Sequence, residues 1–204
     1  MNSVLSTNLI PLRWKAYMYL LYNKSCQSIH NTFIEDAGSQ TPPERLSEDK
    51  GLFEKFQLFW TKNPTHISGT RIFLGSAKNA ADYDSLKRND IKMIINVTSD
   101  VPNFFEDEFI YHRIHLLDIT EDSFYNHIDE INKTLEIVKN YNEGNILVHC
   151  MMGASRSVGF VCMYLMDTLN LNMENAYAFV KDKREAASIN KKFYKELEGW
   201  KMHI

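Results

Sequence analysis

One thiol and one guanidinium stand close together in the chain, with five residues between them, in the segment His149-Cys150-Met151-Met152-Gly153-Ala154-Ser155-Arg156-Ser157. The segment follows an apolar run, Asn145-Ile146-Leu147-Val148, which predicts a strand that ends in a loop. A phosphoryl group presents anionic equatorial oxygens, so its transfer needs an axial nucleophile surrounded by hydrogen-bond donors. Cys150 is expected to be that nucleophile, and the loop after it is expected to carry the donors.

The residues between Cys150 and Arg156 suit a loop whose backbone N–H groups point inward at an anion. A loop of this kind that runs into a helix N-terminus forms an anion-binding nest, and glycine at position 153 suits the curvature. Arg156 can bind two equatorial oxygens with its planar fork, and the same donors favour the thiolate form of cysteine. The predicted phosphate-binding residues are therefore Met151, Met152, Gly153, Ala154, Ser155 and Arg156.

These residues resemble the signature His-Cys-x-x-Gly-x-x-Arg-Ser of the cysteine-dependent protein phosphatases, and specifically of their dual-specificity branch. The resemblance covers about residues 65 to 202, and three other segments look like that family's landmarks in their usual order: Asn96-Val97-Thr98, Ile114-His115-Leu116-Leu117-Asp118 and Ala187-Ser188-Ile189-Asn190. It implies that Cys150 forms a phosphocysteine, that Arg156 binds the phosphoryl oxygens and that Ser157 assists breakdown of the intermediate. It also implies that His149 supports the thiolate from behind the loop.

A phosphocysteine mechanism needs a proton for the leaving oxygen, and hence a carboxylic acid on a loop that faces the phosphate. Asp118 is the candidate, because it ends an apolar run and opens the polar segment 119–123. Its place ahead of the Cys150 strand is similar to that of the family's general acid. Glu121 and Asp122 are rivals, but both are better interpreted as charges at a helix N-terminus.

The substrate class is only partly indicated. The loop 151–155 contains no lysine or arginine, unlike related phosphatases that act on multiply phosphorylated inositol lipids, so lipid substrates are disfavoured. The chain has no Trp-Pro-Asp acid loop and no Lys-Asn-Arg-Tyr-like segment of the kind that builds a deep phosphotyrosine slot in the tyrosine-only branch of these phosphatases. By this comparison it resembles enzymes with a shallower pocket, which would reach phosphotyrosine, phosphoserine and phosphothreonine. Two alternatives remain: an RNA 5′-triphosphatase of the same superfamily, and a phosphoprotein-binding module with little turnover. The acidic chain without a basic stripe argues against the first, and the presence of Cys150 and Arg156 argues against the second.

The composition indicates an ordinary folded domain without polyanionic partners. The chain has 204 residues, 44% of them hydrophobic, and a formal net charge of −3. A phosphoprotein substrate is expected, and no nucleic acid or membrane. The histidines at 66, 112, 115 and 127 are spaced too irregularly for a metal cluster, so neither metal nor cofactor is expected. Three cysteines and the lack of a secretory leader predict a reducing location, the cytoplasm, with the nucleus as a second compartment.

Strand and helix signals alternate from about residue 65 onward, which predicts an α/β fold: a central, mostly parallel sheet flanked by helices, as in protein tyrosine phosphatases. Strands are expected at 71–75, 91–97, 109–117 and 146–148, and helices at 80–89, 124–138, 157–169, 173–186 and 191–202. Cys162 is expected to be an inert core thiol. The mixed-charge run 181–185 is interpreted as a solvated helix face.

The chain divides into a helical N-terminal extension with a linker, residues 1–64, and a catalytic domain, residues 65–204. The aromatic segments 9–22 and 51–60 suit amphipathic helices, separated by a polar stretch that contains Gly38, Pro42 and Pro43. Packing on the same chain is the first expectation for these helices, and a homodimer through them is the second.

Overall fold

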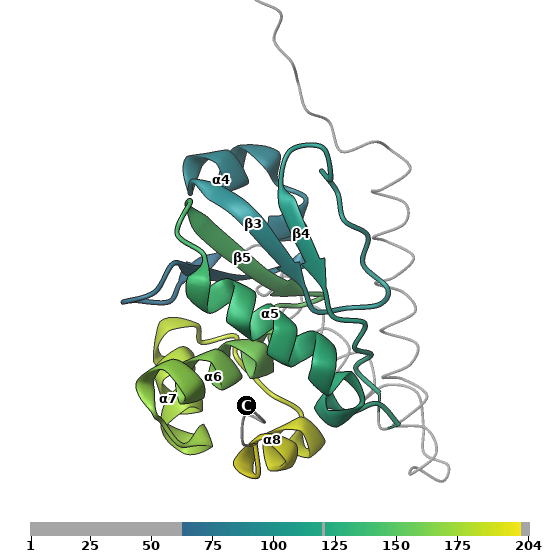
Figure 1. Ribbon diagram of the computed structural model, residues 1–204, viewed down its shortest axis with the longest axis vertical. Coiled ribbons are helices and arrows are strands. Elements are labelled where there is room, and N and C mark those ends of the chain that lie inside the picture. The colour runs from purple at the N-terminus through teal and green to yellow at the C-terminus, as the bar shows by residue number, and fades with distance from the viewer. Residues whose placement is uncertain (1–62, 120, 201–204) are drawn as a thin grey trace, which may run out of the picture. The chain divides into compact units, whose positions relative to one another are not determined.

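The computed structural model describes residues 63–119 and 121–200 (Figure 1). The predicted helices of the extension, within residues 1–62, lie outside the described residues, so their docking and the boundary at residue 64 stay predictions. No helix in the described part is long and apolar enough to cross a membrane.

The described residues build a five-stranded sheet in the order β1-β2-β5-β3-β4. The pairs β2·β5, β5·β3 and β3·β4 are parallel, and only the short β1 is antiparallel to its neighbour. The predicted α/β fold with a mostly parallel sheet is confirmed. The strands are β1 (Thr65–His66), β2 (Ile72–Ser76), β3 (Ile91–Asn96), β4 (Ile110–Arg113) and β5 (Asn145–Cys150).

The central strand β5 is buried on both faces because helices cover both sides of the sheet (Figure 1). Leu147 faces a small core under α3 and α4, whereas Ile146 and Val148 face the main core under the other helices. This two-sided burial explains the continuous apolar run of β5. The helices are α3 (Ala77–Ala80), α4 (Tyr83–Arg88), α5 (Ile128–Asn140), α6 (Arg156–Leu169), α7 (Met173–Lys183) and α8 (Lys191–Glu198).

Several predicted boundaries were wrong. The helix expected at 80–89 is the shorter α4, which begins at Tyr83 because Asp82 caps it by accepting the Ser85 N–H; α3, before it, was not expected. The strand expected at 109–117 stops at Arg113, after which Ile114 and Leu116 turn into the core. The helix expected from residue 124 starts as a 3-10 turn, η1 (Phe124–His127). The helix expected to reach residue 186 ends at Lys183.

Glycine at position 159 lets η1 pack closely against α6. A Cβ atom there would lie 2.4 Å from the ring of Phe124, closer than any real contact. Phe124 is fully buried, and its ring centroid lies 4.7 Å from that of Phe193 in α8. The lack of a side chain at position 159 therefore lets Phe124 pack against α6. This contact fixes the position of η1, which follows the loop that carries Asp118.

Candidate active site

Cys150 is the last residue of β5, and the loop 151–155 leads from it into α6. The side chain is 2% exposed. Its Sγ accepts the backbone N–H of Gly153 at 3.2 Å and the hydroxyl of Ser157 at 3.2 Å. Both donors stabilise negative charge on sulfur, so the loop is built to hold a thiolate.

The carbonyl groups of the loop point away from its centre. Met151 O accepts the N–H of Ala77 at 3.1 Å, Gly153 O accepts Arg184 Nε at 2.8 Å, and Ala154 O accepts the N–H of Ser188 at 2.8 Å. In a planar trans peptide the C=O and the following N–H point in opposite directions. The N–H groups of residues 152, 154 and 155 are therefore turned to the inner side of the loop, as an anion-binding nest requires.

Gly153 has to be glycine in this loop. Its φ angle is 67°, in the left-handed region. A Cβ atom would lie 2.4 Å from the carbonyl oxygen of Gly75 in β2 and 2.7 Å from Nη2 of Arg184. The sequence analysis expected glycine to suit the curvature of this loop. The backbone angle agrees with that expectation, and the neighbouring strand also leaves no room for a side chain.

Arg156 opens α6 and is 5% exposed. Its Nη1 donates to the carbonyl of Leu116 at 3.1 Å and to Oδ1 of Asp100 at 3.3 Å. Its Nε lies 3.6 Å from Oδ2 of Asp118. The guanidinium thus connects the loop after β3, which carries Asp100, with the loop after β4, which carries Asp118.

Asp118 lies beside Arg156, and the rival carboxylate Asp122 does not. Asp118 is 38% exposed, and its Oδ1 accepts Nδ2 of Asn190 at 2.9 Å. Asp122 is buried in its own loop, where it accepts the N–H groups of Leu117 at 2.7 Å and Ser123 at 2.8 Å.

Burial favours the neutral form of Asp122, but the hydrogen bonds of this loop outweigh it and lower the pKa of that carboxyl. Besides the two backbone N–H groups, Asn126 donates to Asp122, and His127 Nε2 lies 3.0 Å from its Oδ1. Asp122 is thus an acceptor that organises the start of η1, as predicted. Glu121 is exposed.

His149 is fully buried in β5, between Gly75 of β2 and Asn96 of β3. Burial lowers its pKa to about 3, and the nearby cations Arg113 and Arg156 act in the same direction. The imidazole is therefore neutral at physiological pH. Because the ring is neutral, it supports the Cys150 thiolate through packing and dipoles and not through charge. Its Nδ1 lies 3.4 Å from the Cys150 carbonyl oxygen.

Cys162, the thiol predicted to lie inert in the core, is found there. Cys162 is fully buried in α6, and burial raises its pKa to about 12. It remains a protonated thiol at physiological pH. Among the described residues no group of histidine, cysteine, aspartate and glutamate side chains could hold a metal ion.

Two functional neighbours, Asp100 and Arg184, were missed by the sequence analysis. Asn190 was named there only as part of a segment that resembles a family landmark, without a role at the site. The interpretation of 181–185 as a solvated face was wrong for Arg184, which is 1% exposed and points back to the loop. One signal was available. Ala176 and Val180 mark the buried stripe of α7, and Arg184 continues it at a spacing of four residues.

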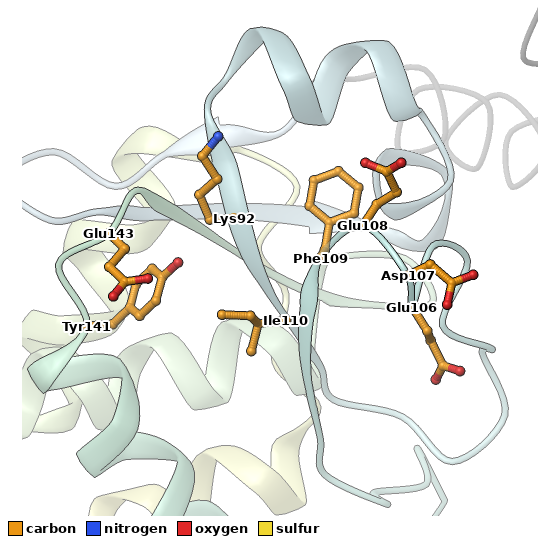
Figure 2. A pocket seen from close by; sticks show the side chains of 8 residues that line it. All are labelled: Lys92, Glu106, Asp107, Glu108, Phe109, Ile110, Tyr141 and Glu143. Carbon is orange, nitrogen blue, oxygen red and sulfur yellow. The ribbon is translucent and has the colours of Figure 1, made fainter.

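A surface pocket of about 550 Å³ lies away from these residues (Figure 2). It is found at the starts of β3 and β4, whereas Cys150 lies where β5 ends. None of the predicted site residues lines it. Its walls are Lys92, Glu106, Asp107, Glu108, Phe109, Ile110, Tyr141 and Glu143.

The fold and the loop define a class of protein in which a cysteine at the end of the central strand is followed by a loop with inward-pointing N–H groups and then by a helix. The family model for the dual specificity phosphatase catalytic domain matches residues 72–203, and the chain belongs to this family. Human protein phosphatase Slingshot homolog 2 is 33% identical over 138 residues, 68% of this chain. Human dual specificity protein phosphatase 6 is 38% identical over 128 residues, 62% of this chain.

Solved structures agree with this assignment. Human DUSP28 is 25% identical with a TM-score of 0.60, and the match covers 67% of this chain and 91% of that chain. DUSP15 is 30% identical with a TM-score of 0.60, covering 67% of this chain and 85% of that chain. The curated relatives are much longer than the match, which spans 10% of Slingshot homolog 2 and 33% of dual specificity protein phosphatase 6.

Proposed function

We propose that this chain is a protein phosphatase that hydrolyses phosphotyrosine and phosphoserine or phosphothreonine through a phosphocysteine intermediate. The geometry of Cys150 is the main support for this proposal. Its sulfur accepts hydrogen bonds from Gly153 and Ser157 inside a loop whose carbonyls point outward. Such a loop would bring the nucleophile and the hydrogen-bond donors to the same phosphoryl group. Membership in the dual specificity phosphatase family supports the substrate class.

In the first step, the Cys150 thiolate attacks phosphorus and a sulfur–phosphorus bond forms while the bond to the leaving oxygen breaks. The inward N–H groups and Arg156 bind the equatorial oxygens. Arg156 would exchange its contact with Asp100, at 3.3 Å, for the phosphoryl oxygens. Asp118 gives its proton to the leaving oxygen, because its side chain lies 3.6 Å from the arginine that binds the phosphoryl group and is therefore close to the leaving oxygen.

In the second step, water attacks the phosphocysteine and the sulfur–phosphorus bond breaks. Asp118, now a carboxylate, takes the proton of the attacking water. The hydroxyl of Ser157, 3.2 Å from Sγ, stabilises the thiolate that leaves. Inorganic phosphate is released, and no metal ion is required by these steps.

Two assays on the full chain, both with EDTA present, test the proposal. The first follows phosphate release from matched phosphotyrosine and phosphothreonine peptides, and the second follows γ-phosphate release from a triphosphorylated RNA. Turnover of the peptides and not of the RNA is expected. The reverse result would identify an RNA 5′-triphosphatase, and tight peptide binding without turnover would identify a phosphoprotein-binding module.

Cys150→Ser is the matched variant for the mechanism. The inward N–H groups and Arg156 remain, so phosphopeptide binding is expected to persist while turnover is lost. After rapid acid quench, the wild type should carry a phosphate on Cys150 that the variant lacks. Cys162→Ser is the control, because that thiol is buried and protonated. Turnover in Cys150→Ser near that of the wild type would contradict the assignment.

The cellular setting is proposed from the sequence alone. A phosphoprotein substrate in the cytoplasm, with the nucleus as a second compartment, accords with a phosphatase role in signalling. Self-association through residues 1–64 is the associated proposal. Imaging of the tagged full chain and measurement of its mass in solution test both.

A further inference from the structure

Arg184 brings a second guanidinium to the phosphate loop. The residue is 1% exposed, and no carboxylate lies within ion-pair distance of it among residues 63–119 and 121–200. A buried cation without a carboxylate partner is costly unless another anion or several acceptors compensate its charge. The charge of Arg184 therefore has to be compensated by an anion other than a carboxylate of these residues.

The polar contacts of Arg184 lead to the loop. Nε donates to the carbonyl of Gly153 at 2.8 Å, and Nη1 donates to the hydroxyl of Thr65 at 3.1 Å. Nη2 is buried and has no hydrogen-bond partner in the described part of the chain. It would touch a Cβ atom on Gly153 at 2.7 Å, so it lies directly against the residue that donates to the Cys150 sulfur.

Negative charge at Cys150 compensates the charge of the buried guanidinium. Burial lowers the pKa of Arg184, and negative charge at Cys150 acts in the opposite direction. Coulomb interaction is mutual, so a guanidinium stabilised by the thiolate stabilises that thiolate to the same extent. The interaction is effective because neither group is accessible to screening water.

We propose that Arg184 is a cationic positioning residue of the phosphate site, which stabilises the Cys150 thiolate from behind the loop and orients the Gly153–Ala154 peptide. The charge acts on the sulfur, and the Nε–H bond turns the N–H of Ala154 inward. The first role concerns the resting protein and is independent of the substrate. The second rests on the proposed function, because it matters only when a phosphoryl group is bound.

The test measures the rate of Cys150 alkylation by iodoacetamide against pH, in the full chain, with the modified peptide quantified by mass spectrometry. Arg184→Met removes the charge and keeps an apolar stem. Its alkylation midpoint is expected to rise by about one pH unit, the size expected when one nearby charge is removed at a buried site. Lys183→Met is the control, because it removes an equal charge from the neighbouring position, where the side chain is 37% exposed.

Arg184→Lys separates charge from geometry. The ammonium keeps a cation behind the loop, so the midpoint should return toward that of the wild type. It cannot reproduce the fixed pair of bonds to Gly153 and Thr65, so kcat/KM on a phosphopeptide should stay at least about tenfold below wild type. If Arg184→Met does not unfold cooperatively, Arg184→Gln replaces it, because the amide keeps hydrogen-bond donors and lacks the charge.

An unshifted midpoint in the charge-removing variant, or an equal shift in Lys183→Met, overturns the proposal. Alkylation needs no substrate, so its result stands apart from the phosphatase assays. If Arg184→Met shows the expected midpoint shift while the wild type turns over no phosphopeptide, the proposed function is wrong and the thiolate role of Arg184 stands.

Discussion

Replacing Gly153 by alanine should abolish most of the activity while leaving the fold in place. The φ angle of 67° costs a non-glycine residue about 1–2 kcal/mol. The new Cβ would also lie 2.4 Å from the carbonyl oxygen of Gly75, whereas such carbon–oxygen contacts are normally about 3.3 Å or longer. Gly75 lies in β2, which is paired with β5 along its length, so the loop rather than the sheet must move.

The displacement follows from these distances. Restoring a normal contact moves the loop by about 1 Å, and a misplacement of that size at a reacting centre costs about a hundredfold in rate. The N–H of residue 153 would also leave the Cys150 sulfur, which it now contacts at 3.2 Å. We therefore expect kcat/KM of Gly153→Ala on an aryl phosphate to fall by about a hundredfold or more.

Gly69→Ala is the matched control. Gly69 has a φ angle of 78°, close to that of Gly153, but no atom lies within 4 Å of its would-be Cβ. It should lose about 1–2 kcal/mol of unfolding free energy through its backbone and keep its turnover. Urea unfolding and steady-state kinetics measure both quantities. A Gly153→Ala protein with more than half of the wild-type kcat/KM would refute the reasoning.

Arg156→Lys should reduce kcat by about a hundredfold or more, because a single ammonium does not clamp two oxygens; near-normal kcat would contradict the role. Asp118→Asn should slow phosphoserine hydrolysis by about a hundredfold but an activated aryl phosphate much less; equal losses would indicate a structural role, and a larger loss in Asp122→Asn would move the acid there. The pKa of His149, about 3 against 6.5 for an unperturbed histidine, means that only the unfolded state gains this proton as pH falls below 6.5. Unfolding free energy should therefore drop by up to about 1.4 kcal/mol per pH unit, and His149→Gln should flatten that slope between pH 6.5 and 5; an unchanged slope would exclude His149 as its source. Deleting residues 1–64 should preserve aryl phosphate hydrolysis but lower solubility or change the oligomeric state. The reason is that the aromatic residues of the extension would no longer cover the apolar surface on which they are expected to dock. Loss of activity in a folded truncation would place part of the site in the extension.

The sequence by itself determined the parts of the site that are local in the chain. Cys150, the loop and Arg156 are contiguous, so strand, turn and helix signals within a dozen residues place them on one strand–loop–helix unit. The same applies to the parallel sheet, whose apolar runs are long enough to identify buried strands. Boundaries were less accurate where one side chain decides them, as Asp82 does at the start of α4.

Tertiary structure alone decided which distant groups meet that loop. Asp118 and Asp122 are both acidic residues of one polar segment, and only the packing of η1 on α6 turns the first toward Arg156 and buries the second in its own loop. Asp100 comes from the connection between β3 and β4, whereas Arg184 and Asn190 both come from the connection between α7 and α8. Chain spacing carries no information about which of these residues converge on the loop. Convergence depends on the strand order, which brings the ends of β3 and β5 together, and on how α7 and α8 pack over α6. Those are properties of a closed core, in which each side chain's place is fixed by contacts far along the chain.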